Sequence, residues 1–353
     1  MAEKPASVLM LSLGGTIAMT SSNGPGGVVP TLTAEDLIAA VPGLAETGIE
    51  VQVQTFRQLP GASLDFDDLT ALATLIAERT ATGGVDGVVV TQGTDTIEET
   101  AYLLDLLHAG DAPVVITGAM RNPTMAGADG PANVLAAIRT AASPITRTLG
   151  AVVVFADEIH AARHVRKTHS TSVATFRSPN TGLLGHVIEG TVRLFSRPPS
   201  RLVVPLEQVA RVPRIGLYTV TLGDDGALLA SADDIDGLVV AGFGVGHVPQ
   251  RLIDRLTTLA ARIPLVLTSR TGAGPALQST YAFPGSETDL QRRGLTNAGF
   301  LDPYKARILL HALLATSADH DTIAAAFSAA GGTGDAACWP WPAHDSKQEK
   351  QHA

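Results

Sequence analysis

The chain has 353 residues, which exceeds the size that one hydrophobic core usually serves, so we predict two domains. Hydrophobic residues make up 45% of it and charged residues 17%, a composition that supports packed cores and excludes wholesale disorder. The formal net charge of −9 argues against a nucleic-acid partner, because phosphate backbones need a concentrated basic face. The densest basic stretch, Arg163–Lys167, is too short to form one.

The single cysteine, Cys338, excludes an intrachain disulfide and a cysteine metal cluster. The histidines show no HExxH-like spacing, so we expect neither a metal nor a cofactor. The first apolar run ends at Gly14 and is too short for a signal peptide. No apolar stretch reaches the ~20 residues needed to span a bilayer. We therefore expect a cytoplasmic protein that has no membrane partner.

Short apolar runs, each followed by small or polar residues, recur along the chain. Their continuous rather than alternating apolar character indicates strands buried on both faces, as in parallel sheets. In chain order the predicted strands are Val8–Leu13, Val51–Phe56, Gly87–Thr91, Val114–Thr117, Ala151–Phe155, Ile215–Val220, Gly237–Ala241 and Pro264–Thr268.

Helical patterns alternate with these runs. Asp65 or Asp67 is predicted to cap the first clear helix, and Thr96 to begin the next, with two glutamates in its first turn. Pro131 and Pro303 are typical of a first helical turn, and a last helix is expected near Asp319–Ala330. Alternating strands and helices predict an α/β fold.

A proline-rich stretch between Ser196 and Pro213 marks the expected domain boundary. We predict a larger N-terminal catalytic α/β domain over 1–197, with a mostly parallel sheet flanked by helices. A linker over 198–213 is expected to lead to a smaller α/β domain over 214–330. Residues 331–353 are rich in glycine and then in polar residues, and we expect them to form a flexible tail.

Hydroxyl, carboxylate and amine side chains follow the predicted strands, where open α/β sheets bind ligands. Gly14-Gly15 allows a sharp turn that displays Thr16, and Thr94-Asp95 begins a helix. Each has an ordinary structural interpretation when taken alone: a strand-to-helix turn, a helix cap, and, for Lys167, a solvated surface charge. Neither a dinucleotide fingerprint nor a Walker lysine is present.

The combination favours nucleophilic catalysis. A threonine hydroxyl is a poor nucleophile unless a base or proton relay activates it. A buried lysine can act as that base, and a neighbouring carboxylate can orient it. Thr16, Thr94, Asp95 and Lys167 supply such a set, and backbone N–H groups at the Thr94 turn could stabilise an oxyanion.

Two long motifs resemble those of the bacterial L-asparaginase family, which has the asparaginase/glutaminase fold. Leu-Gly-Gly-Thr-Ile-Ala at 13–18 resembles the first signature, and Thr-Gln-Gly-Thr-Asp-Thr-Ile-Glu-Glu-Thr-Ala at 91–101 resembles the second. The similarity covers roughly residues 8 to 330, including 118–121, 128–131, 167–168, 173–176 and 302–307.

The resemblance implies an enzyme that hydrolyses L-asparagine to L-aspartate and ammonia, with a role in asparagine catabolism. Thr16 would attack the amide carbon, and Thr94, Asp95 and Lys167 would form the relay. Substrate contacts are implied for Ser63 at the α-carboxylate, Asp95 at the α-amino group and the Ala119 carbonyl at the amide nitrogen.

The same resemblance implies that the active sites lie at a subunit interface. Glu287 matches an acid that the family supplies from a neighbouring subunit to the substrate's α-amino group, and His247 matches an asparagine that supports that site. A homodimer or homotetramer would then be needed.

Three departures from the family pattern bear on mechanism. Gln92 stands where histidine is common, and His247 introduces a group that titrates near neutrality. The glycine-rich first-domain loop, residues 19–33, contains no tyrosine beside Thr16, and Tyr281 is our candidate to replace it.

Two alternatives stay open from the sequence, and a third is disfavoured. Glutamine differs from asparagine by one methylene, which a pocket discriminates by only ~1–3 kcal/mol, so a glutaminase-asparaginase is the nearest. A catalytically weak binder of acidic amino acids is the second. The third, the amidase subunit of a tRNA-dependent amidotransferase, would usually bring an extra N-terminal domain and a nucleic-acid-binding face, and the sequence shows neither.

Overall fold

A computed structural model describes residues 5–15, 17, 19–21, 28–30 and 33–342, with only the backbone described at 19–21, 28–30, 34 and 231–233. The described chain divides into two compact units, and the division falls between Arg201 and Leu202. Both units are α/β, which confirms the predicted fold class. The expected linker over 198–213 stays a prediction. Each unit is described by itself below.

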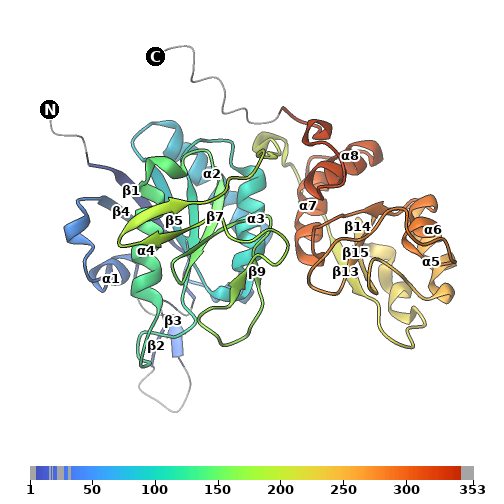
Figure 1. Ribbon diagram of the computed structural model, residues 1–353, viewed down its shortest axis with the longest axis horizontal. Helices are drawn as coiled ribbons and strands as arrows, with labels where there is room; N and C mark the ends of the chain where they lie inside the picture. Colours follow the sequence, from blue (N-terminus) through green and yellow to red (C-terminus); the bar gives the residue numbers. More distant parts are fainter. Residues whose placement is uncertain (1–4, 16, 18, 22–27, 31–32, 343–353) are drawn as a thin grey trace. The chain divides into compact units, whose positions relative to one another are not determined.

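The N-terminal unit is built on an eight-stranded sheet, in the order β12-β11-β8-β7-β6-β5-β1-β4 (Figure 1). The strands β4, β1, β5, β6 and β7 run parallel, and β8, β11 and β12 form an antiparallel edge. The strand bounds are β1 (Ser7–Ser12), β4 (Glu50–Thr55), β5 (Gly87–Thr91), β6 (Val114–Thr117), β7 (Ala151–Phe155), β8 (Glu158–Ala161), β11 (Gly185–Ile188) and β12 (Thr191–Leu194).

Helices cover both faces of this sheet. Successive residues of a strand point to opposite faces, and the helices bury the apolar side chains of the central strands on both of them. The helices α1 (Ala34–Ala39) and α4 (Gly130–Ala142) share a core with Val8, Val89 and Val152. The helices α2 (Phe66–Ala81) and α3 (Ile97–Leu107) pack together on the other side (Figure 1). Two short hairpins complete the unit: β2 (Met19–Ser21) with β3 (Val28–Pro30), and β9 (Arg166–Lys167) with β10 (Phe176–Arg177).

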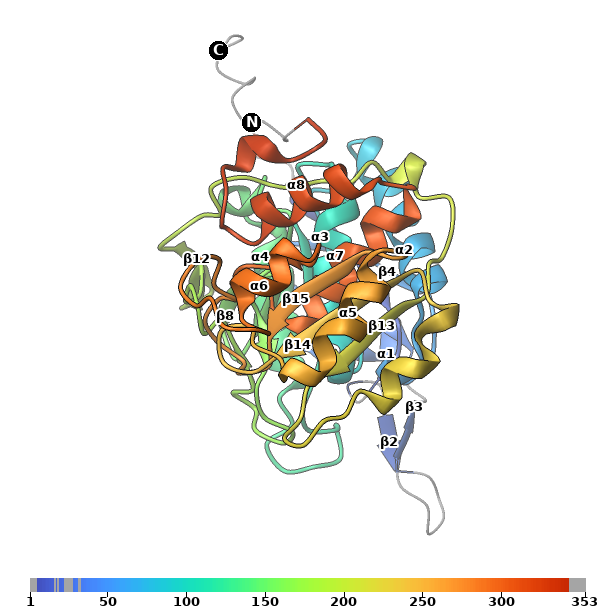
Figure 2. The same ribbon diagram turned by 90° about the vertical axis from the view of Figure 1, so that its right-hand side faces the viewer.

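The C-terminal unit contains a four-stranded parallel sheet in the order β13-β14-β15-β16. Figure 2 shows α5 (Ile253–Ala260) and α6 (Glu287–Arg292) in front of its strands. The long α7 (Pro303–Ala315) packs on β13, β14 and β15, and α8 (His320–Ala330) lies against β16. The strand bounds are β13 (Ile215–Thr219), β14 (Gly237–Gly242), β15 (Leu265–Ser269) and β16 (Thr296–Asn297).

The eight predicted strands are confirmed, with ends that differ by at most one residue. Asp65, rather than Asp67, caps α2, and Asp302 and Asp319 cap α7 and α8 through their side chains. Thr96 occupies the N-cap position of α3, as predicted, although its side chain makes no capping hydrogen bond there. A 3₁₀ turn, η4 (Thr94–Thr96), precedes the helix. Within the described residues, none of the helices combines the length and the apolar character that crossing a bilayer requires.

The prediction of a flexible tail is wrong for the part of it that the structure describes. Residues 336–338 form a short 3₁₀ helix capped by Asp335. Trp339 is 5% exposed, and its indole Nε1 donates a 2.9 Å hydrogen bond to the carbonyl of Val203. The glycines of this stretch suggested that it is unstructured. The burial of the Trp339 ring and the hydrogen bond of its indole N–H hold it in place instead. Residues 343–353 lie outside the described part of the chain.

Acid is expected to destabilise the C-terminal unit through His311 of α7, which is 2% exposed. Burial, together with the positive charge of Arg307, lowers the pKa of His311 to about 3. The unfolded chain therefore binds a proton that the folded chain does not, so stability present above about pH 6.5 is lost as the pH falls toward 3. Between pH 6.5 and 4.5 this linkage amounts to about 2–3 kcal/mol.

Urea unfolding of the whole chain at these two pH values measures the loss. A His311→Leu variant should show about 2–3 kcal/mol less pH dependence than the wild type. The exposed His320 provides the matched control, and His320→Gln should leave the dependence unchanged. Parallel profiles for the wild type and His311→Leu would contradict the assignment.

Candidate active site

Three strand-end loops of the N-terminal unit meet backbone to backbone at glycines. Gly15 has φ +85°, and a Cβ built on it would lie 2.1 Å from the backbone nitrogen of Gly93. A Cβ on Gly61 would lie 2.8 Å from the carbonyl oxygen of Gly93. Only glycine permits these approaches, so the exits of β1 and β5 and the segment after β4 are held together. The predicted nucleophile Thr16 follows Gly15 directly and lies outside the described residues.

Lys167 contacts both of its predicted partners. Its Nζ lies 3.0 Å from the Thr94 hydroxyl oxygen and 3.0 Å from Oδ1 of Asp95. The Thr94 residue is 6% exposed, and the side chains of Lys167 and Asp95 are 16% and 66% exposed. A mostly buried amine therefore touches a buried hydroxyl, while the carboxylate beside it reaches toward solvent.

A small hairpin positions the amine. Lys167 in β9 pairs with Phe176 in β10, and the Phe176 ring packs against that of Phe155 at 4.9 Å between centroids. Phe155 ends β7, so the hairpin is anchored to the main sheet. This packed aromatic pair thus holds the strand of Lys167, which meets Thr94 although the two residues are 73 positions apart in sequence.

Gln92 fixes the turn that carries Thr94. Its side-chain Nε2 donates to the Thr96 hydroxyl at 3.2 Å, and that hydroxyl donates to the Gly61 carbonyl at 3.0 Å. Gly61 begins the 3₁₀ turn η3 (Gly61–Ser63), which ends at the exposed Ser63. The residue that departs from the family pattern therefore ties the Thr94 turn to the Ser63 turn, a role that the sequence analysis missed.

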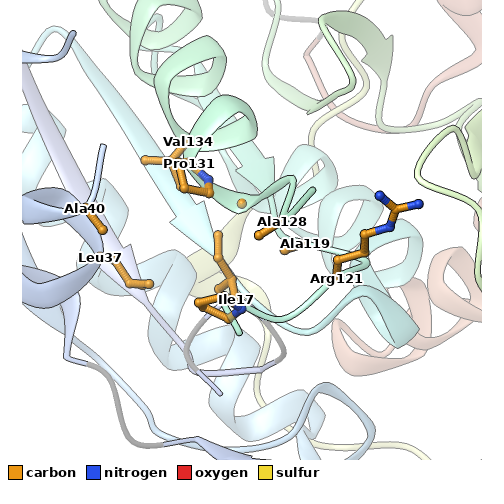
Figure 3. A pocket seen from close by; sticks show the side chains of 10 residues that line it. Ile17, Leu37, Ala40, Ala119, Arg121, Ala128, Pro131 and Val134 are labelled. Atoms are coloured by element: carbon orange, nitrogen blue, oxygen red, sulfur yellow. The ribbon is translucent and has the colours of Figure 1, made fainter. Parts of the chain in front are cut away.

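Ala119 follows β6 and is 1% exposed. A Cβ on the preceding Gly118 would lie 2.5 Å from the Gln92 carbonyl oxygen, so this turn packs closely on the exit of β5. On its other side lies an apolar cavity of about 50 Å³ that Ile17, Leu37 and Val134 also line (Figure 3). The predicted residues Ser63, Thr94, Asp95, Ala119 and Lys167 thus stand on neighbouring loops at one edge of the sheet.

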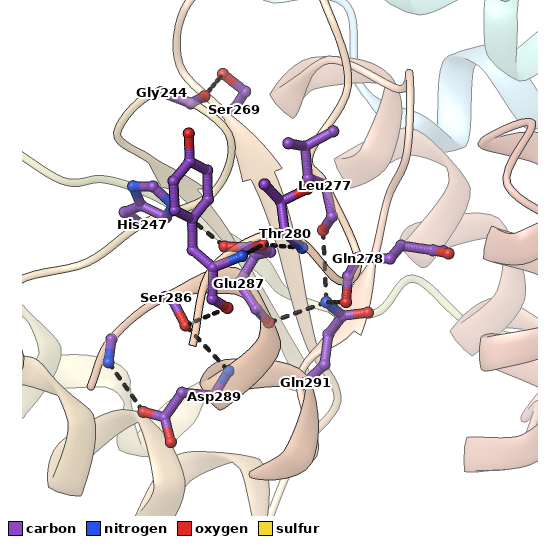
Figure 4. A network of polar contacts seen from close by, with 12 residues as sticks. Gly244, His247, Ser269, Leu277, Gln278, Thr280, Ser286, Glu287, Asp289 and Gln291 are labelled. Carbon is purple, nitrogen blue, oxygen red and sulfur yellow. Dashed lines mark hydrogen bonds and ion pairs between the residues drawn. The ribbon is translucent and has the colours of Figure 1, made fainter. Parts of the chain in front are cut away.

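Glu287 lies in the C-terminal unit and is fully buried (Figure 4). Its Oε1 accepts hydrogen bonds from the backbone N–H groups of Thr280 at 2.9 Å and Tyr281 at 2.7 Å. Its Oε2 lies 3.1 Å from Nε2 of His247. Burial alone would raise the pKa of Glu287, but these hydrogen bonds outweigh it and hold the pKa below its usual range.

His247 sits between two aromatic rings. Its ring lies 4.9 Å from that of Tyr281 and 4.9 Å from that of Phe283, edge to face in both pairs. Tyr281 and Phe283 are 44% and 46% exposed, and the His247 side chain is 23% exposed. The structure therefore joins the predicted residues His247 and Glu287 into one hydrogen-bonded pair, in which the imidazole is the accessible member.

Comparison with known families assigns both units. The family model described as "Asparaginase, N-terminal" matches residues 7–200, and the one described as "Glutaminase/Asparaginase C-terminal domain" matches residues 214–327. Together they span most of the chain.

Curated relatives match along nearly their whole length. A protein named "Probable L-asparaginase" from Deinococcus radiodurans is 36% identical over 332 residues, which covers 92% of this chain and 98% of that one. An "L-asparaginase" from Bacillus licheniformis is 33% identical and covered to 95%, with 88% of this chain aligned. A "Glutaminase-asparaginase" from Pseudomonas fluorescens biotype A is 32% identical, with 90% of this chain and 88% of that one covered.

Among solved structures, a probable cytoplasmic L-asparaginase from Campylobacter jejuni superposes with a TM-score of 0.82. It is 31% identical to this chain in sequence, and the match covers 91% of this chain and 99% of that one. The sequence motifs, both family models and the shared fold agree, and the chain belongs to the asparaginase/glutaminase family.

Proposed function

We propose that the chain hydrolyses the side-chain amide of L-asparagine to give L-aspartate and ammonia. The observation that carries the proposal is the contact of Lys167 Nζ with both Thr94 and Asp95, because it pairs a hydroxyl with a base and an orienting carboxylate. The relatives named L-asparaginase support the choice of substrate.

In this scheme the Thr16 hydroxyl oxygen attacks the amide carbon and gives up its proton. The tetrahedral intermediate collapses as that proton reaches the leaving nitrogen, which departs as ammonia. The ester that remains on Thr16 is cleaved by water, which the Thr94 hydroxyl orients and from which Lys167 removes a proton through Thr94. Tyr281 is our candidate to activate Thr16 in place of the loop tyrosine, and a Tyr281→Phe variant with unchanged turnover would remove it.

The α-amino and α-carboxylate groups of the substrate are assigned to exposed side chains. Asp95, with a side chain 66% exposed, holds the α-amino group, and Ser63 receives the α-carboxylate. The Ala119 carbonyl accepts a hydrogen bond from the amide nitrogen.

His247 and Glu287 of a neighbouring subunit complete the α-amino site in a homodimer or homotetramer. Because Glu287 is fully buried, we propose that it acts through His247. The carboxylate holds the Nε2 proton, which leaves Nδ1 free to accept from the substrate's ammonium. Sedimentation of the intact protein checks the assembly, and a monomer with full activity would contradict it.

Glutamine is the second candidate substrate, since a relative 32% identical is named "Glutaminase-asparaginase". A single methylene separates the two amides, so the same residues could serve both. We further propose a cytoplasmic location, in keeping with the name of the Campylobacter jejuni protein, although a Haemophilus influenzae relative is named periplasmic. Cell fractionation distinguishes the two compartments.

Ammonia release from L-asparagine and L-glutamine tests the proposed reaction. The wild type should release ammonia from asparagine, and Thr16→Ala and Thr94→Val should each lower kcat at least about 1,000-fold, because each loses a hydroxyl that takes part in the reaction. Binding of asparagine by the wild type without ammonia release would favour the weak binder of acidic amino acids instead.

A further inference from the structure

The Asp129 side chain does not cap the helix that it precedes. It occupies the N-cap position of α4, yet its side chain makes no cap hydrogen bond there, although aspartate at this position usually does. Its carboxylate instead accepts from two backbone N–H groups of the turn after β6: Met120 donates to Oδ2 at 3.1 Å and Arg121 donates to Oδ1 at 2.9 Å.

The bond from Met120 fixes the direction of the Ala119 carbonyl. The N–H of Met120 and the C=O of Ala119 belong to one peptide group, and the described chain contains no cis peptide bonds. In a trans peptide these two bonds point in opposite directions. Because the N–H points to Asp129, the Ala119 carbonyl oxygen must point away from it. The buried Ala119 side chain packs against Gly130: a Cβ built on Gly130 would lie 3.4 Å from the Cβ of Ala119. Packing therefore restrains Ala119 in addition to the hydrogen bond of Met120.

Asn133 of α4 holds this arrangement through three further hydrogen bonds. It is 2% exposed, and its Nδ2 donates to Asp129 Oδ2 at 3.1 Å and to the Gly118 carbonyl at 3.0 Å. Its Oδ1 accepts from the backbone N–H of Ala156 at 3.0 Å, in the turn between β7 and β8. Both amide hydrogens and the oxygen are used, so one buried side chain joins Asp129, the exit of β6 and the exit of β7.

We propose that Asp129 and Asn133 are positioning residues that aim the Ala119 carbonyl at the substrate's amide nitrogen. This inference rests on the proposed function, in which that carbonyl accepts from the –NH₂ of asparagine. A carbonyl oxygen so directed attracts an amide donor and repels a carboxylate oxygen, so the device favours the amide substrate over the aspartate product.

An Asp129→Asn variant separates this role from general support of the fold. In either orientation of the new amide, its –NH₂ would face a backbone N–H donor: that of Arg121 in one, and that of Met120, beside the Asn133 amide, in the other. The turn that carries both N–H groups should therefore shift and the 119–120 peptide should rotate. We expect kcat/KM for L-asparagine to fall about 10- to 100-fold. The Kd for L-aspartate, which offers no amide donor and loses a repulsive contact, should stay the same or fall. Asp319→Asn, the same change at an N-cap that serves its own helix, is the control and should alter neither quantity.

Three outcomes decide the matter. Unchanged kcat/KM in Asp129→Asn, or an equal loss of asparagine turnover and aspartate binding, would overturn the positioning role while leaving the hydrolytic function intact. Absence of ammonia release by the wild type would instead defeat the proposed function. Should Asp129→Asn fail to fold, Asn133→Ser removes the bond to Gly118, and a smaller loss of kcat/KM with no loss of aspartate affinity is then expected.

Discussion

Replacing Lys167 with methionine is expected to lower kcat for L-asparagine at least about 1,000-fold while the protein stays folded. Methionine fills a similar volume but has no amine, so the Thr94 hydroxyl loses the base that lies 3.0 Å from it. The Asp95 carboxylate also loses its ion-pair partner, but its side chain is 66% exposed and remains solvated. Ammonia release gives the rate, and circular dichroism and thermal unfolding check the fold.

Lys167→Arg distinguishes a base from a mere positive charge. The guanidinium keeps the charge and can still pair with Asp95, but it does not lose its proton in proteins. If Lys167 removes a proton, the arginine variant should be nearly as inactive as the methionine variant. Recovery of most of the activity in Lys167→Arg would show that the amine acts only by its charge.

Gly15→Ala is expected to lower the free energy of unfolding by about 3 kcal/mol or more and to abolish measurable turnover. Two costs add. A side chain at φ +85° is strained, and the new methyl group would lie 2.1 Å from the Gly93 nitrogen, so the β1 and β5 exits must separate. Because Thr94 follows Gly93, its position relative to the β1 exit changes with them. Urea unfolding and ammonia release measure the two effects.

Gly48 and Gly83 provide matched controls. They have φ of +67° and +68°, and a Cβ on either would meet nothing within 4 Å. Their alanine variants incur the backbone strain alone, which is about 1–2 kcal/mol, and should keep full turnover. If Gly15→Ala behaved like these controls, the close contact between the two loops would not matter to the site.

The parallel part of the fold could be predicted because most of its strands, such as β1, β5, β6 and β7, are continuous apolar runs buried on both faces. The antiparallel edge could not. The turn from β7 to β8 passes through Ala156 and Asp157 at φ of 50° and 62°, a conformation for which Asn-Gly or Asp-Gly is the usual sequence signal. The short strand Glu158–Ala161 therefore gave no local sign of a hairpin.

The site shows a similar division. Thr94, Asp95 and Lys167 could be identified because reactive side chains at strand ends converge in open α/β sheets. Asp129 and Asn133 could not, because their roles depend on which backbone groups of distant turns they meet. Asp129 in particular sits where an ordinary helix cap is expected, and only its hydrogen bonds show that it serves the Ala119 turn.

A crystal structure of the protein with L-aspartate bound tests the central claim most directly. We predict that the side-chain carboxylate of the ligand will contact the hydroxyls of both Thr94 and Thr16, with the Lys167 amine behind Thr94 and the ligand's α-amino group on Asp95. A ligand bound away from Thr94, or a Lys167 side chain turned into solvent while the ligand is in place, would contradict the account.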